Sequence, residues 1–457
     1  MIFVLIFLCG FILAHTFSDK LTLLEKLSLA FPIGLGTASM AMFKTEIILH
    51  SISLPLLQLS LIATLLGCIG IIAFMHVKGI RKIEKPNFKI NMSWFSLPWA
   101  VFASTIVYLA IGITKKCLYW PVAEFDTIQG YDLLSKAIAH EGRLANSILT
   151  NIDIVAGCGP RLLYPPLLSM SNAICYMSGM ESPRIINSLF FISWLFLFYA
   201  LLRRFIKPLG AIFFTFIMVI TPEMFAHASF SLTNYPCAIY TASAVIFFVY
   251  WYKERTAGFL PLSALLMAFG LWTRSDVVMV NGALLLVAAY VFYKEKNWQP
   301  LVFFLASLSV FFIWSFYSKA VIPRAASSFF ITHLFFDFDK LSAVLSTAWG
   351  MLTNTQTYGL TFLLFFIALL VNAKAIIQKD QWVLLFVTLL AWGGYTLLYY
   401  QMDNTDGTLF SNGGWMLSGY KRGVFVYAPL CLFYVATSRH ISWLFDKLDD
   451  MVSFGKN

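Results

Sequence analysis

Long apolar runs, separated by short polar stretches, follow one another along most of the chain. A run of about 17–25 apolar residues is long enough for an α-helix to cross the hydrocarbon core of a bilayer. The runs therefore predict an all-α, polytopic transmembrane bundle with about 13 membrane-spanning helices. The approximate limits of the spans are 1–17, 25–47, 52–76, 96–114, 184–203, 207–221, 233–252, 258–273, 276–294, 299–318, 358–376, 381–400 and 423–438.

Two apolar segments need a separate interpretation. Residues 1–17 lack the basic start and the small-residue cleavage site of a signal peptide, so we interpret them as the first span. The segment 165–180 is also apolar, but it is short and begins with Pro165-Pro166. It is expected to lie along the membrane surface rather than to cross the bilayer.

The amino-acid composition agrees with a membrane protein. Hydrophobic residues make up 60% of the 457 residues and charged residues only 12%, whereas soluble domains carry about 25% charged residues. The chain has too few charges to cover the surface of soluble domains. A soluble enzyme, a disordered protein and a nucleic-acid-binding module are therefore excluded, and no nucleic-acid partner is expected.

Basic residues predict the orientation of the bundle, because Lys and Arg concentrate in cytoplasmic connections. Their positions put the amino terminus outside and the carboxyl-terminal tail inside, and Lys115-Lys116 is a deviation at the outer end of a span. Most of the net charge of +10 is thus an orientation signal. The cytoplasmic groups are Lys78, Arg81, Lys82, Lys85 and Lys89; Arg203, Arg204 and Lys207; Lys253 and Arg255; Lys294 and Lys296; and Lys374 and Lys379.

Three long connections, 115–183, 319–357 and 401–422, fall on the opposite, exoplasmic side. Long loops gathered on one face of a scaffold commonly carry function, and these are expected to contain short interfacial helices. The predicted organisation is an N-terminal part with a basic connection, a transmembrane core that contains the first long loop, and C-terminal helices with the other two loops. The three parts are residues 1–90, 91–318 and 319–457.

The seven cysteines form neither a CxxC pair nor a Cys/His cluster, so no zinc or redox motif is predicted. Cys117 and Cys158 fall in the same long exoplasmic loop. A disulfide between them is compatible with an oxidising compartment, and the sequence leaves its formation open.

The first long loop contains an amphipathic pattern from Thr127 to Glu141, which predicts a helix that ends at Gly142. Asp126 precedes this helix and Gln129 follows three residues later, as in a capping box. One interpretation is that Asp126 caps the helix. The other is that its carboxylate accepts a proton from an incoming hydroxyl. The two roles are compatible.

Several motifs follow one another along residues 96–300: Phe125-Asp126, Tyr131, Lys136-Ala137, Tyr164-Pro165-Pro166-Leu167, Arg184-Ile185-Ile186-Asn187, Thr221-Pro222-Glu223 and Thr273-Arg274-Ser275-Asp276. In their order and sidedness they resemble the motifs of the GT-C superfamily of integral-membrane glycosyltransferases, with a weaker similarity at Lys421-Arg422. The branch is similar to bacterial protein O-mannosyltransferases and aminoarabinose transferases. This resemblance implies a catalytic carboxylate in the first exoplasmic loop, which is Asp126, with Glu124 as the substitute.

The chain departs from the family at two places. Thr233-Asn234 stands where the family often has an acid after the threonine, and Tyr164 stands where aminoarabinose transferases have a lysine. The second difference argues against aminoarabinose as the sugar.

Four basic residues are candidates for binding the phosphate of a lipid carrier: Arg161, Arg274, Lys421 and Arg422. The guanidinium group of an arginine can donate two parallel hydrogen bonds to two oxygens of one phosphate. For Arg274 the alternative is snorkelling to the headgroups beside a cap formed by Ser275 or Asp276. For Lys421 and Arg422, which flank a span on its outer side, the alternative is contact with anionic headgroups.

The remaining site candidates belong to the loops that would hold the donor or the acceptor. His227 is also compatible with a purely structural histidine. Glu124, Asp126 and Asp132 could collect a divalent cation, but neither a metal ion nor another cofactor is predicted. The loop candidates are Glu124, Tyr131, Lys136, Tyr164, His227, Asn234 and Asp276.

The expected function is transfer of a sugar, with inversion, from a polyprenyl-phosphate-linked donor to a hydroxyl of a glycan, glycolipid or protein. The expected place is the exoplasmic face of a bacterial cytoplasmic membrane. One alternative is a lipid or glycan transporter, which usually places ionisable groups near the bilayer midplane. A polymerase or ligase of surface glycans, which shares the lipid-phosphate chemistry, is the other.

Overall fold

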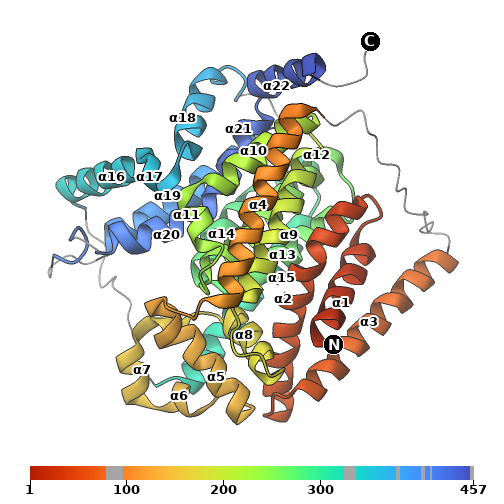
Figure 1. Cartoon of the computed structure of the whole chain (residues 1–457), viewed down its shortest axis with the longest axis vertical. Coiled ribbons are helices and arrows are strands. Elements are labelled where there is room, and N and C mark those ends of the chain that lie inside the picture. The colour runs from red at the N-terminus through yellow and green to blue at the C-terminus, as the bar shows by residue number, and fades with distance from the viewer. Residues whose placement is uncertain (79–95, 324–335, 377–380, 403–406, 412–413, 453–457) are drawn as a thin grey trace.

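The computed structural model describes residues 1–78, 96–323, 336–376, 381–402, 407–411 and 414–452. Every regular element in these ranges is a helix, and the protein is a polytopic helical membrane protein (Figure 1). Eight helices in the described ranges are long and apolar enough to cross a bilayer. They are α2 (Leu23–Leu49), α3 (Leu54–Val77), α4 (Leu97–Tyr119), α9 (Ile185–Leu202), α12 (Asn234–Glu254), η4 with α14 (Ser275–Glu295), α15 (Gln299–Val321) and α19 (Trp382–Gln401).

The other predicted spans coincide with shorter or bent helices. Four have 10 to 17 residues, and a bent pair, Met416–Thr437 with Arg439–Val452, turns by 65° and raises the count in the described ranges to nine when taken as one span. The prediction of about 13 spans is confirmed only as a multi-span helical protein. The four short helices are α1 (Ile2–Phe17), α10 (Pro208–Ile220), α13 (Phe259–Thr273) and α18 (Thr361–Val371).

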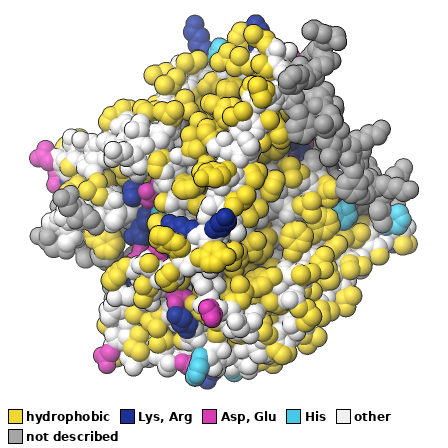
Figure 2. Space-filling model, in the orientation of Figure 1, with side chains coloured by type: hydrophobic (Ala, Val, Ile, Leu, Met, Phe, Trp, Pro, Cys, Tyr) yellow, Lys and Arg dark blue, Asp and Glu magenta, His cyan; other side chains and the backbone are white. Residues whose placement is uncertain are grey.

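The centre of the bundle is α12, whose side chains are almost all buried. It packs against α9 and α13, and it contacts the short helix η7 (Phe425–Tyr427) near its N-terminal end, where Tyr235 lies against Phe425. By contrast, α3, α4 and α15 expose most of their apolar side chains. Such helices bury their polar backbone internally and present apolar side chains to lipid. The outer surface of the bundle is therefore apolar over most of the face in Figure 2.

The long first loop folds into a group of helices at the lower end of the bundle in Figure 1, between α4 and α9. The predicted helix over 127–141 is confirmed as two joined pieces, and it ends at Gly142, whose φ of 64° is left-handed. The loop elements are the π-helical turn η2 (Thr127–Tyr131), α5 (Asp132–Glu141), α6 (Ser147–Thr150), α7 (Ile152–Cys158), the 3₁₀ turn η3 (Gly159–Leu163) and α8 (Leu167–Met177).

The short helix α8 lies elsewhere than the sequence predicts. It does not lie on a surface, because nearly all its side chains are buried against α2, α5 and α13. The expectation that it is too short to cross the bilayer holds, since α8 has 11 residues. It packs against α5 in the interior of the protein.

A second group of short helices lies beside the carboxyl-terminal half of the bundle. Among them, α11 contacts α17, and α20 continues directly from η6. The Tyr358 hydroxyl donates a hydrogen bond to the carbonyl of Lys421, which ties α17 to α20. The elements are α11 (Pro222–His227), α16 (Phe338–Thr353), α17 (Thr355–Tyr358), η6 (Met416–Tyr420), α20 (Lys421–Val424), η7, α21 (Ala428–Thr437) and α22 (Arg439–Val452).

Some sequence-based expectations are corrected or fall outside the described ranges. Cys117 and Cys158 are both buried and free, so they do not form a disulfide. Three features lie outside the described residues. They are most of the basic connection that follows Lys78, the boundary between 1–90 and 91–318, and Lys379. The loops 319–357 and 401–422 are described in part.

The helices α1 and α2 approach each other closely at two glycines. A Cβ atom on Gly34 would lie 2.0 Å from the carbonyl oxygen of Ile6, and one on Gly10 would lie 1.9 Å from that of Ala30. Membrane helices pack through small residues because apolar side chains gain little by leaving lipid for one another. The contact between α1 and α2 therefore depends on the absence of these side chains.

We expect Gly34→Ala to lower the free energy of unfolding by about 1–3 kcal/mol, because the added methyl group overpacks a backbone contact. Thermal unfolding in detergent, followed by tryptophan fluorescence, measures the change. Gly70→Ala on α3 is the matched control, since a Cβ atom there meets nothing within 4 Å. Equal melting temperatures for the two variants would contradict the close contact.

Candidate functional site

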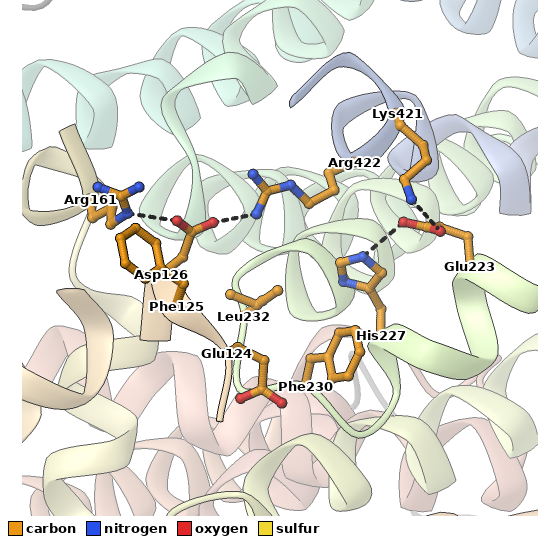
Figure 3. Close-up of a pocket in the computed structure, with 10 residues that line it drawn as sticks. All are labelled: Glu124, Phe125, Asp126, Arg161, Glu223, His227, Phe230, Leu232, Lys421 and Arg422. Atoms are coloured by element: carbon orange, nitrogen blue, oxygen red, sulfur yellow. Dashed lines mark hydrogen bonds and ion pairs between the residues drawn. The ribbon is translucent and has the colours of Figure 1, made fainter. Parts of the chain in front are cut away.

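A cavity of about 440 Å³ opens where the first loop meets α11 and α20. Three segments that are far apart in the sequence line it, and Figure 2 shows acidic and basic side chains gathered near this place on a mostly apolar face. The lining residues, drawn in Figure 3, are Glu124, Phe125, Asp126, Arg161, Glu223, His227, Phe230, Leu232, Lys421 and Arg422.

Asp126 lies between two guanidinium groups (Figure 3). Arg161 Nε donates to Asp126 Oδ1 at 2.6 Å, and Arg422 Nη1 donates to Oδ2. The side chain makes no capping bond to the helix that follows, so the capping-box interpretation with Gln129 is wrong. Two charged donors bind a carboxylate more strongly than backbone N–H groups do.

The two arginines are themselves oriented by neighbouring groups. Arg161 Nη1 donates to the carbonyl of Cys158 at 3.0 Å, and its guanidinium lies 4.8 Å above the ring of Phe125. Arg422 Nε donates to the carbonyl of Ser418 at 3.2 Å. Gly130, four residues after Asp126, lets Arg161 come close to this loop, since a Cβ atom on Gly130 would lie 2.7 Å from Arg161 Cβ.

The electrostatics of this cluster favour a charged carboxylate. Burial raises the pKa of the Asp126 carboxyl, but hydrogen bonds and charge from Arg422 and Arg161 outweigh it, so the pKa lies below its ordinary value. Asp126 is therefore an anion at neutral pH. It is also a weak base as long as both guanidinium groups hold it.

A second ion-pair cluster lines the other side of the cavity. Glu223 contacts Lys421 through Oε2 and His227 through Oε1, both at 3.1 Å. Burial lowers the pKa of His227 below its ordinary value despite the neighbouring Glu223. For Glu223, burial raises the pKa, yet contacts with His227 and Lys421 outweigh burial and lower it overall. At neutral pH Glu223 is therefore a carboxylate and His227 a neutral imidazole.

Arg184, at the start of α9, binds two segments next to the cavity, the start of the first loop and the segment that follows α11. Its guanidinium donates to Glu124 Oε1 at 3.1 Å, to the carbonyl of Ser229 at 2.7 Å and to that of Trp120 at 3.2 Å. It also donates to the carbonyl of Pro121. The side chain is only 2% exposed. One buried cation therefore joins the first loop to the segment between α11 and α12.

Arg274 lies behind the cavity and does not line it. It is 8% exposed and donates to Asp276 through Nε at 3.0 Å and Nη2 at 2.6 Å. Its guanidinium lies 5.3 Å above the ring of Tyr164, which in turn packs against Tyr131 at 5.9 Å. Tyr131 completes the cluster with a 3.3 Å hydrogen bond to Thr233. Of these predicted site residues, Tyr131 and Arg274 are buried and Tyr164 and Asp276 are partly buried, and none of the four lines the cavity.

The remaining two predicted residues have structural contacts. Lys136 is paired with Asp132 at 2.8 Å and its side chain is 60% exposed, away from the cavity lining. Asn234 Nδ2 donates to the carbonyl of Arg422 at 2.8 Å, which fixes the backbone that carries this arginine. The six predicted residues that the cavity brings together are Glu124, Asp126, Arg161, His227, Lys421 and Arg422.

Glu223 is an acidic lining residue that the sequence does not single out as a site candidate. It occurs there only within the motif Thr221-Pro222-Glu223. Its spacing of four residues from His227 puts both side chains on one face of a helix, which is a usable signal. Within the described residues, no group of three or more His, Cys, Asp and Glu side chains could hold a metal ion.

We expect Arg184→Gln to lower the free energy of unfolding by about 3–5 kcal/mol, because it leaves Glu124 buried without its cation. Arg255→Gln is the control, since Arg255 pairs with Glu295 at the surface, with both side chains more than a third exposed. That pair is expected to contribute about 0–1 kcal/mol. Thermal unfolding in detergent measures both, and similar losses would contradict the role of Arg184.

Comparison of the chain with protein-family models, with curated proteins and with solved structures finds no match in any of the three. What is shown of its class is an all-helical integral membrane protein, with eight or nine candidate spans in the described ranges. Its function has to be inferred from the chemistry of the cavity.

Proposed function

We propose that the protein is a glycosyltransferase of the GT-C type, which moves a sugar from a polyprenyl-phosphate-linked donor to an acceptor hydroxyl. The observation that carries the proposal is the meeting of Asp126 with Arg161, Lys421 and Arg422 around one cavity. A carboxylate beside several cations provides a proton acceptor and a phosphate-binding group in one place.

The surroundings of the cavity suit a lipid-linked substrate. Its lining includes Phe125, Phe230 and Leu232. Phe125 is 61% exposed, and Tyr119 and Trp120 at the end of α4 are exposed as well. Aromatic side chains of this kind favour the boundary between headgroups and hydrocarbon. A polyprenyl chain could therefore lie in the bilayer while its phosphate and sugar reach the cavity.

The proposed reaction is a single displacement at the anomeric carbon. The acceptor oxygen forms a bond to this carbon, while the bond from the carbon to the phosphate oxygen breaks and its electron pair stays on the phosphate. Asp126 accepts the proton of the acceptor hydroxyl. Arg161, Lys421 and Arg422 stabilise the negative charge that grows on the leaving phosphate. Attack opposite to the leaving group inverts the anomeric configuration.

Two other functions use parts of the same chemistry. A lipid transporter would need ionisable groups along a path through the bilayer. The charged cavity groups instead lie outside the eight long helices, in the first loop, in α11 and near the start of the bent pair Met416–Thr437 with Arg439–Val452. A surface-glycan polymerase or ligase would release a lipid phosphate as well, so the acceptor distinguishes it.

We propose a bacterial cytoplasmic membrane as the location, with the cavity on the exoplasmic side, because of the distribution of basic residues.

We expect Asp126→Asn to slow sugar transfer by about 10²–10⁴-fold, because the amide cannot accept the proton. The measurement is release of polyprenyl phosphate from a panel of polyprenyl-phosphate hexoses and N-acetylhexosamines in proteoliposomes. Asp153→Asn, in the same loop but exposed and away from the cavity, is the matched control. Full activity of folded Asp126→Asn protein would remove Asp126 as the base, and movement of intact donor without cleavage would favour a transporter.

A further inference from the structure

Every charged side chain that lines the cavity already has an ionic partner. Asp126 is paired with Arg161 and Arg422, Glu223 with Lys421, and Glu124 with Arg184, which does not line the cavity. The neutral imidazole of His227 also contacts Glu223. Among the lining residues, no cation is therefore left over for an incoming anion. A ligand phosphate can gain a charged partner here only by taking one from a carboxylate.

The Asp126 pairs are the more accessible ones. The Asp126 side chain is 21% exposed, whereas those of Glu223 and Glu124 are 11% and 12% exposed. The cations Arg161, Arg422 and Lys421 are similar to one another, at 26%, 32% and 31%, so it is the carboxylate that distinguishes the pairs. A partly exposed ion pair is weaker than a buried one and is exchanged at a lower cost. An anion that enters the cavity is therefore expected to displace Asp126 first.

The geometry around Asp126 resembles the geometry that a phosphodiester requires. The two guanidinium groups approach the carboxylate from opposite sides, one on each oxygen (Figure 3). A phosphodiester also presents two equivalent unesterified oxygens with one negative charge, and guanidinium groups bind carboxylate and phosphate in the same manner. The space between Arg161 and Arg422 is thus an anion-binding site that the chain itself occupies.

We propose that Asp126 is an internal substitute for the donor phosphate: the phosphate takes over Arg161 and Arg422, and the displaced carboxylate becomes free to act as the base. This inference rests on the proposed function and adds a regulation to it. Without a donor, the base is held as a weakly basic ion pair. With the donor bound, it is released beside the sugar. After transfer, the carboxylate competes with the lipid phosphate for the same guanidinium groups and promotes its release.

Binding of farnesyl phosphate to the purified full chain in detergent tests the competition directly. Asp126→Asn is expected to tighten binding by about tenfold, because the amide cannot compete for the two guanidinium groups. Asp153→Asn is the control for net charge. It removes one negative charge from the same loop, but Asp153 is exposed and does not line the cavity, so this change releases neither Arg161 nor Arg422. Its dissociation constant is expected to change by less than about threefold.

A double variant shows whether the gain comes from the guanidinium groups. Adding Arg422→Gln to Asp126→Asn is expected to remove most of the tightening, because one of the two released donors is gone. Melting temperatures of all variants establish that they are folded. If Asp126 had a merely structural role, the single variant Asp126→Asn and the double variant would both bind farnesyl phosphate more weakly than the wild-type protein.

The pH dependence of transfer by the wild-type protein gives an independent readout. The profile of kcat/KM reports the free enzyme, in which the two guanidinium groups keep the pKa of Asp126 low, and that of kcat reports the donor complex. Loss of both cations and a nearby phosphate raise the pKa of Asp126. The acidic limb of kcat is therefore expected at a higher pH than that of kcat/KM. Other charged or titratable groups near Asp126 are Tyr131, Tyr164, Glu124, Glu223, His227, Lys421 and Arg274.

The outcomes separate this inference from the proposed function. Tightening in Asp126→Asn alone supports the inference. Equal tightening in Asp153→Asn would overturn it, because general charge would then explain the gain. Unchanged or weaker binding in Asp126→Asn would overturn it as well, while the loss of transfer in that variant would still support the glycosyltransferase. No binding of farnesyl phosphate by any form would overturn both.

Discussion

The ion pairs of Asp126 with Arg161 and Arg422 hold together three parts of the chain on which the cavity depends. The contact with Arg422 joins residues 296 positions apart, and the contact with Arg161 joins residues 35 positions apart. Near a bilayer, charged groups are costly to desolvate unless they are paired. Pairing therefore forces the first loop and the start of the last helical segment to meet. The cavity is the space that remains between them.

Burial divides the charged groups of this region into two kinds. Arg184 and Arg274 are almost completely enclosed and bind carboxylates and carbonyls of the chain, so they act as fixed structural cations. Arg161, Lys421 and Arg422 are a quarter to a third exposed and face the cavity. Only the second kind can exchange partners with a ligand. This division connects packing with the proposed chemistry, since rigid cations shape the loop and accessible ones bind phosphate.

The sequence predicts the helices well because the bilayer imposes a simple requirement. Long apolar runs coincide with the eight long helices, and shorter runs coincide with α1, α10, α13 and α18. The helix over 127–141 and its end at Gly142 are also predictable, since they depend on local periodicity and backbone freedom. The burial of α8 could not be foreseen, because an apolar helix of 11 residues fits a surface and an interior equally well.

The candidate site is predictable in its residue types but not in its partners. Asp126 stood out by its position before a helix, yet the local pattern indicated a cap, whereas distant guanidinium groups bind it in the fold. Arg274 and Arg161 are both phosphate-binding candidates from the sequence, and burial separates them, since Arg274 is enclosed and Arg161 faces the cavity. Partner choice depends on tertiary contacts, which a single sequence does not encode in any local pattern.

The central claim is that Arg161 and Arg422 bind the phosphate of a polyprenyl carrier, and native mass spectrometry of the purified protein tests it most directly. The account predicts a co-purified polyprenyl phosphate or polyprenyl-phosphate sugar on the wild-type protein. It also predicts loss of this lipid from a folded Arg161→Gln/Arg422→Gln variant. Retention of the same lipid by that variant, or a bound lipid without phosphate, would contradict the account.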